Sequence, residues 1–98
     1  MDVRIQAIHF EMAEHLAEFI NKKSNKLARR HPAVSEVDVT LKVVKPETAM
    51  NKEVVLRVTE PQNGEMVATK VADTFEEAFD LAAEAVERQL DKNKDKTK

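Results

Sequence analysis

The sequence contains no cysteine, no tryptophan, no tyrosine and only one glycine among its 98 residues. Without cysteine, the chain can form neither a disulfide framework nor a zinc–thiolate site, and it has no cysteine nucleophile. One glycine and three prolines are too few for a glycine-rich phosphate-binding loop or a long flexible linker. No apolar stretch approaches the roughly 20 residues that a membrane-spanning helix needs. These absences favour one domain of common size that makes no contact with a membrane.

Side chains that could carry catalysis are scarce or unsuitably spaced. The only histidines are His9, His15 and His31, and no two of them have the i, i+4 spacing of a helical metal pair. Ser24 and Ser35 are the only serines, and neither lies in a nucleophile-elbow motif. The carboxylates fall on expected solvent faces, where a solubilising role is far commoner than acid–base catalysis. We therefore expect no enzyme activity, no catalytic residue, no metal site and no cofactor.

Four segments alternate between apolar and polar residues, which is the pattern of half-buried β-strands. They span residues 2–8, 35–44, 53–60 and 65–72. The Asn63-Gly64 pair between the last two predicts a hairpin turn. The segment 45–51 is expected to be a surface loop.

Two further segments have the spacing of amphipathic helices. The first spans residues 10–30 and ends before Pro32, because the residue that precedes a proline disfavours helical geometry. The second opens at Thr74, whose spacing to Glu77 fits a capping box. The apolar stripes are Met12, Leu16, Phe19, Ile20 and Leu27 in the first helix, and Phe75, Phe79, Ala82, Val86 and Leu90 in the second.

The order β-α-β-β-β-α predicts an α+β domain over residues 1–91. Two helices would cover one face of a mainly antiparallel four-stranded sheet. The segment 92–98 is polar and basic, and we expect it to be a disordered tail.

Basic residues cluster in the first helix, although the formal net charge of the chain is only −2. Lys22, Lys26 and Arg29 fall on one flank of this helix. Lys23 and Arg30 fall inside the apolar stripe, so either their stems reach outward or the helix end projects past the sheet. The helix macrodipole also favours an acidic first half and a basic second half. The cluster alone therefore does not require a polyanionic partner.

The second helix separates its charges onto two flanks. Arg88, Lys92 and Lys96 lie on one side, and Lys94 adds charge near the end of the chain. We expect the acidic flank to point away from the basic surface, so that this surface can bind a polyanion despite the small net charge. With all phenylalanines assigned to the core, RNA would be recognised through its backbone and shape. The acidic flank consists of Glu76, Glu77, Asp80, Glu84, Glu87 and Asp91.

Several short motifs occur in a recognisable order. The stretch ERQLDKNKDK (87–96) fits the pattern E-R-Q-L-x-K-x-K-x-K, and LKVVK (41–45) fits L-K-V-x-K. The stretches LAEFINKKSNKL (16–27) and TFEEAFDLA (74–82) are similar to the two helices of the same family. Over essentially the whole chain, the sequence resembles the short form of the ribosome hibernation-promoting factor family, which includes the ribosome-associated inhibitor and the sigma-54 modulation proteins. Ala13 departs from this pattern, because Thr or Ser commonly caps the first helix, and Glu76 replaces a frequent Tyr.

The resemblance implies a cytoplasmic protein that binds the small ribosomal subunit in the channel for messenger and transfer RNA. There it would block translation in stressed or stationary cells. The residues whose positions match would contact ribosomal RNA phosphates: Lys23, Lys26, Lys42, Arg88, Lys92, Lys94 and Lys96. Lys22, Arg29 and Arg30 join this RNA-binding set on the charge argument alone.

An alternative function remains open. The acidic flank of the second helix could dock a basic partner and make the protein an interaction module. Only polar residues follow Leu90, so we expect no dimerising domain in this chain. The free protein is then expected to be a monomer, and pairing of ribosomes would need a separate partner.

Overall fold

The computed structural model describes residues 2–45 and 49–96, and for residues 93–96 it describes the backbone alone. The elements are β1 (Asp2–Ile8), α1 (Glu14–Arg30), β2 (Glu36–Val43), β3 (Lys52–Glu60), β4 (Gly64–Ala72) and α2 (Phe75–Lys96). The strands form one sheet in the order β1-β2-β3-β4. β1 pairs with β2 in parallel, and the other two pairings are antiparallel. The predicted α+β class and mainly antiparallel sheet are confirmed.

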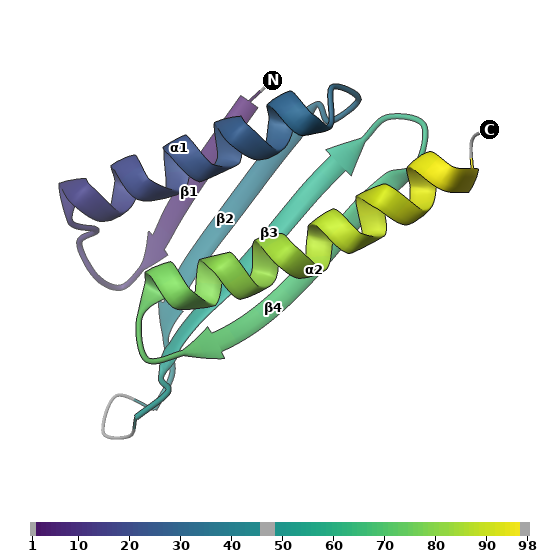
Figure 1. Ribbon diagram of the computed structural model, residues 1–98. Coiled ribbons are helices and arrows are strands. Elements are labelled where there is room, and N and C mark those ends of the chain that lie inside the picture. Colours follow the sequence, from purple (N-terminus) through teal and green to yellow (C-terminus); the bar gives the residue numbers. More distant parts are fainter. Residues whose placement is uncertain (1, 46–48, 97–98) are drawn as a thin grey trace.

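Both helices cover the same face of the sheet and run side by side in the same direction (Figure 1). α1 packs on β1, whereas α2 packs on β3 and β4. A parallel strand pair requires the chain to cross back over the sheet between the strands, and α1 makes this crossover. Because α2 starts at the same end as α1, the basic second halves of both helices lie at the other end (Figure 1).

The core lies between the sheet and the two helices. Val39 of β2 is in register with Leu56 of β3, which is in register with Ala68 of β4, and all three are buried. The five residues of the predicted α2 stripe are buried as well. Phe79 contacts Phe19 of α1 edge-on, with ring centroids 6.4 Å apart. This aromatic contact joins the two helices directly.

The two helices begin differently. Thr74 Oγ1 accepts a hydrogen bond of 3.1 Å from the backbone N–H of Glu77, which confirms the predicted cap of α2. At α1 the N-cap is Ala13, whose backbone is extended and which provides no side-chain hydrogen bond. α1 begins at Glu14 rather than at residue 10, because the chain turns at His9, which has a φ of 63°. Phe10 then stacks on Phe75, with ring centroids 5.1 Å apart.

The hairpin turn between β3 and β4 also follows the sequence. The backbone N–H of Asn63 donates to the carbonyl oxygen of Glu60 over 3.1 Å. Gly64 adopts a φ of 86°, a left-handed conformation that glycine enters without a steric penalty. The Asn-Gly pair therefore lies at the turn that it predicts.

α2 is longer than the sequence predicts. Its backbone is helical through Lys96, so the structure differs from the expected disordered tail over residues 92–96. Adding a residue to an existing helix costs far less than starting one, which explains why a segment without apolar residues can continue a helix that is packed on the sheet up to Leu90. Residues 97 and 98 lie outside the described residues.

Candidate nucleic-acid interface

A groove with a volume of about 380 Å³ lies between α1 and α2. Leu27 and Ala83 contribute its apolar surface, while charged side chains make up most of its lining. The wall from α1 is basic and the wall from α2 is mainly acidic. The charged lining residues are Lys23, Lys26 and Arg30 from α1, and Asp80, Glu84, Glu87, Arg88 and Asp91 from α2.

Lys23 reaches across this groove toward α2. Its Nζ lies 3.6 Å from Oδ1 of Asp80 and 5.4 Å from the centre of the Phe19 ring. The side chain is 46% exposed, so the ammonium lies over the aromatic ring while it stays accessible to water. Of the two arrangements that the sequence left open for Lys23, the structure shows the outward-reaching stem.

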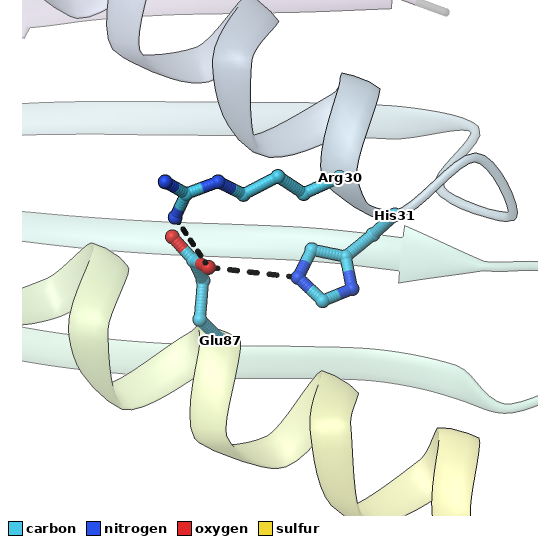
Figure 2. A network of polar contacts seen from close by, with 3 residues as sticks. All are labelled: Arg30, His31 and Glu87. Carbon is cyan, nitrogen blue, oxygen red and sulfur yellow. Dashed lines mark hydrogen bonds and ion pairs between the residues drawn. The ribbon is translucent and has the colours of Figure 1, made fainter.

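The C-terminal end of α1 contacts α2 through Glu87, as Figure 2 shows. Oε2 of Glu87 lies 3.4 Å from Nη1 of Arg30 and 3.6 Å from Nε2 of His31. His31 is only 8% exposed, and its backbone N–H caps α1 by donating to the carbonyl oxygens of Leu27 and Ala28. Glu87 is 28% exposed, whereas Arg30 is 57% exposed. One carboxylate thus lies within 4 Å of nitrogen atoms from two consecutive residues at the end of α1.

The acidic flank of α2 does not point away from the basic surface, so that prediction is wrong. Asp80 and Glu87 face α1 and pair with its bases. Because the helices are parallel, the acidic flank of α2 turns toward the edge of α1 that carries Lys23 and Arg30. The sequence reasoning missed these carboxylates as part of the site. The available signal was that both bases fall within an apolar stripe, where a side chain faces a neighbouring element.

The remaining bases of α1 have no carboxylate partner within the part of the chain that the structure describes. Lys22, Lys26 and Arg29 are exposed, and none of them forms an ion pair with any side chain that the structure describes. Lys22 and Arg29 lie opposite the buried stripe, on the solvent side of the helix. Lys26 lines the groove. These three residues form a positively charged ridge along the second half of α1.

The candidate residues of α2 are arranged less uniformly. Arg88 is 74% exposed and pairs with Glu84, one helical turn earlier. Lys92 is exposed and does not line the groove. Lys94 and Lys96 belong to the helical backbone, but their side chains lie outside the described residues.

Lys42 is not brought together with the other candidates. In β2, Leu41 is buried beneath the helices and Lys42 is exposed. Because successive strand residues point to opposite faces, Lys42 lies on the helix-free face of the sheet. The structure therefore separates Lys42 from the helix-borne bases by the thickness of the sheet.

The chemistry available at this surface is electrostatic. Ammonium and guanidinium groups bind phosphate oxygens by charge-assisted hydrogen bonds, and a row of them binds a nucleic-acid backbone. Among the residues that the structure describes, no group of three or more histidines and carboxylates could hold a metal ion. Within the same ranges, neither helix combines the length and the apolar composition that crossing a membrane requires.

Comparison with solved structures finds the same fold. A ribosomal subunit interface protein from Coxiella burnetii has a TM-score of 0.83 and 21% sequence identity, covering 96% of this chain and 98% of its own. The N-terminal domain of Protein Y from Thermus thermophilus has a TM-score of 0.74 and 19% identity, covering 92% of this chain and 96% of its own. At these identities the likeness concerns the fold.

Sequence comparison assigns the family. A search of curated protein sequences finds no match. Residues 3–98 match the sequence profile of the family described as sigma 54 modulation protein / S30EA ribosomal protein. Because this match extends over nearly the whole chain, the protein belongs to the sigma 54 modulation protein / S30EA ribosomal protein family.

Proposed function

We propose that this protein is a ribosome hibernation factor of the cytoplasm. It binds the small ribosomal subunit in the channel for messenger and transfer RNA and inhibits translation under stress or in stationary phase. Contacts with ribosomal RNA phosphates hold it there, and it catalyses no reaction. Family membership over residues 3–98 carries this proposal.

The charge distribution supports an RNA partner. The exposed bases Lys22, Lys26 and Arg29 lie on the second half of α1, beside the second half of α2 with Lys92 (Figure 1). Parallel helices bring these bases to one end of the molecule, although the chain as a whole is slightly acidic. A compact basic end of this kind suits a narrow channel walled by RNA phosphates.

The alternative function, docking of a basic protein through the acidic flank of α2, has weaker support. Asp80 and Glu87 are already paired with bases of α1, and Glu84 is paired with Arg88. A basic partner would have to displace these intramolecular pairs before it could bind. These three carboxylates are therefore less available to a partner than Lys22, Lys26 and Arg29, which form no ion pair among the described residues.

Competition on purified small subunits tests the proposal. Subunits loaded with messenger RNA and transfer RNA should bind the protein much more weakly than empty subunits, and excess protein should prevent loading. The protein should also inhibit translation in a purified system in proportion to its occupancy of the subunits. Simultaneous binding of the protein, messenger RNA and transfer RNA to one subunit would contradict the proposed location.

The proposal includes the oligomeric state. We propose that the free protein is a monomer and that pairing of ribosomes, where it occurs, depends on a separate factor. Sedimentation equilibrium of the protein checks the first statement. A sucrose gradient of ribosomes mixed with the protein alone checks the second.

A further inference from the structure

We propose that the carboxylates of α2 act as internal competitors for RNA phosphate, so that the groove between the helices is a self-inhibited anion site. Asp80 and Glu87 occupy the bases that would otherwise be available to a ligand. The inference deepens the proposed function and rests on it for the identity of the natural ligand. The competition itself is a property of the folded chain.

The geometry of the groove supports this competition. Two of the three bases that α1 contributes to the groove have a carboxylate within 4 Å, namely Asp80 for Lys23 and Glu87 for Arg30. Lys26 is the third, and within the described part of the chain it forms no ion pair. A phosphate can thus bind Lys26 directly, but it can bind Lys23 or Arg30 only by displacing the carboxylate that each of them contacts.

The two pairs differ in how readily they exchange. Lys23 and Asp80 are 46% and 53% exposed, so water already competes with their contact. Glu87 is only 28% exposed, is paired with Arg30 and lies beside the buried His31. A phosphate should therefore displace Asp80 more easily than Glu87. We infer that Glu87 keeps Arg30 oriented toward α2, while Asp80 sets the threshold for binding at Lys23.

This arrangement gives the surface selectivity. A flexible single strand that offers one phosphate at a time gains little at Lys23 and Arg30, because each of these contacts costs an existing ion pair. A rigid RNA surface can contact the free bases Lys22, Lys26 and Arg29 together and then exchange with the groove carboxylates. The carboxylates thus weaken binding to incidental RNA more than binding to a fitted RNA surface.

Neutral amide variants test the competition. Asp80→Asn with Glu87→Gln preserves side-chain shape while removing two negative charges, and Asp80→Asn alone is the milder form. The control, Asp2→Asn with Glu36→Gln, changes net charge equally at two exposed residues that face each other in register on β1 and β2. Both pairs are compared with the unmodified protein for binding to small subunits and to a single-stranded RNA homopolymer, at several salt concentrations.

The groove variant should bind the homopolymer about three- to tenfold more tightly, as release of one or two exposed ion pairs implies, and the control should change it less than about twofold. The advantage should shrink as salt rises, because screening weakens the internal pairs. A groove variant that binds neither probe more tightly than the control overturns the inference. If small subunits bind none of the proteins, the proposed function fails, while the homopolymer still decides the competition. If none of the proteins binds small subunits or the homopolymer, both the proposed function and the inferred competition are overturned.

A thermal unfolding curve accompanies each variant. Loss of the folded state in the double variant would leave Asp80→Asn as the deciding protein, since the Asp80 side chain is 53% exposed and its ion pair is with the exposed Lys23. Tighter binding by this single variant supports the inference, and unchanged binding overturns it.

Discussion

Nζ of Lys23 on α1 lies 3.6 Å from Oδ1 of Asp80 on α2, across the groove between the two helices. The pair shows that the acidic flank of α2 and the basic edge of α1 share one surface. Lys23 and Arg30 in the groove are consequently paired with carboxylates, whereas Lys22, Lys26 and Arg29 form no ion pair with any side chain that the structure describes. RNA binding should therefore depend unequally on the two groups of bases.

The free bases of α1 should contribute most to RNA binding. Replacing Lys26 and Arg29 together with Ala removes two charges that form no ion pair among the described residues, and we expect affinity for small subunits to fall at least about tenfold. The slope of log K against log salt should become shallower by about 1.4–1.8, which corresponds to two lost phosphate contacts. Both side chains are exposed, so the free energy of unfolding should change by less than about 0.5 kcal/mol per substitution.

A charge-matched variant on the other face provides the control. Arg4→Ala with Arg57→Ala also removes two exposed bases, but both lie on the helix-free face of the sheet and neither belongs to the RNA-binding set. We expect less than about a twofold change in affinity. Equal losses in the two variants would mean that the protein binds RNA through both faces or only through its overall charge.

Phe79 should be essential for stability because it joins the helices. Its side chain is 1% exposed and contacts Phe19 edge-on. Phe79→Ala should lower the free energy of unfolding by about 3–5 kcal/mol, measured by urea denaturation. Leu81→Ala is the control on the same helix, since Leu81 is 41% exposed. A loss of similar size at Leu81 would contradict this description of the core.

The two serines should respond oppositely to replacement by alanine. Ser24 is fully buried on α1, and its hydroxyl has no hydrogen-bond partner within the part of the chain that the structure describes. Ser24→Ala should stabilise the protein by about 0.5–2 kcal/mol, because it removes an unpaired polar atom and improves helix propensity. Ser35 Oγ donates to the carbonyl oxygen of Thr59 over 3.2 Å. Ser35→Ala should cost about 0.5–1.5 kcal/mol in the same unfolding experiment. Destabilisation by Ser24→Ala would indicate a partner for its hydroxyl.

The uneven capping of the helices gives another pair of opposite effects. Thr74→Ala removes the hydroxyl that accepts from the N–H of Glu77, and should destabilise the protein by about 1 kcal/mol. Ala13→Ser introduces a hydroxyl at an N-cap whose backbone is already extended, and should stabilise it by about 0.5–1 kcal/mol. Thermal unfolding measures both. No gain at Ala13 would mean that the helix start shifts or that the new hydroxyl is misdirected.

Local patterns in the sequence were sufficient for most of the fold. The alternation around Val39 and Leu56 identified the strands, and Thr74 marked the start of α2 within one residue. The start of α1 was predicted too early, because the apolar spacing continues back through Met12 and Phe10 while the backbone turns at His9. Periodicity detects which residues face the core, but it does not detect a turn made by a residue that is not glycine.

The site depended on information that no single helix contains. The angular positions of Asp80 and Glu87 on α2 were apparent, but the direction in which they face depends on strand order and on the parallel arrangement of the helices. Parallel pairing of β1 with β2 brings α1 alongside α2. Lys42 is a second example. A motif match identified it as a candidate, but the match did not predict that it lies on the face of the sheet opposite the helices. Its contribution to RNA binding stays a prediction.

Co-sedimentation with purified ribosomal subunits across a range of salt concentrations tests the proposed function. The protein should pellet with small subunits and not with large ones. Its affinity should fall as salt rises. The slope of log K against log salt should be about −0.7 to −0.9 for each phosphate contacted, so several contacts should give a total slope of several units. The Lys26→Ala, Arg29→Ala variant should show weaker binding and a shallower slope. Binding that is independent of salt, or equal for both subunits, would contradict recognition of small-subunit RNA through the bases of α1.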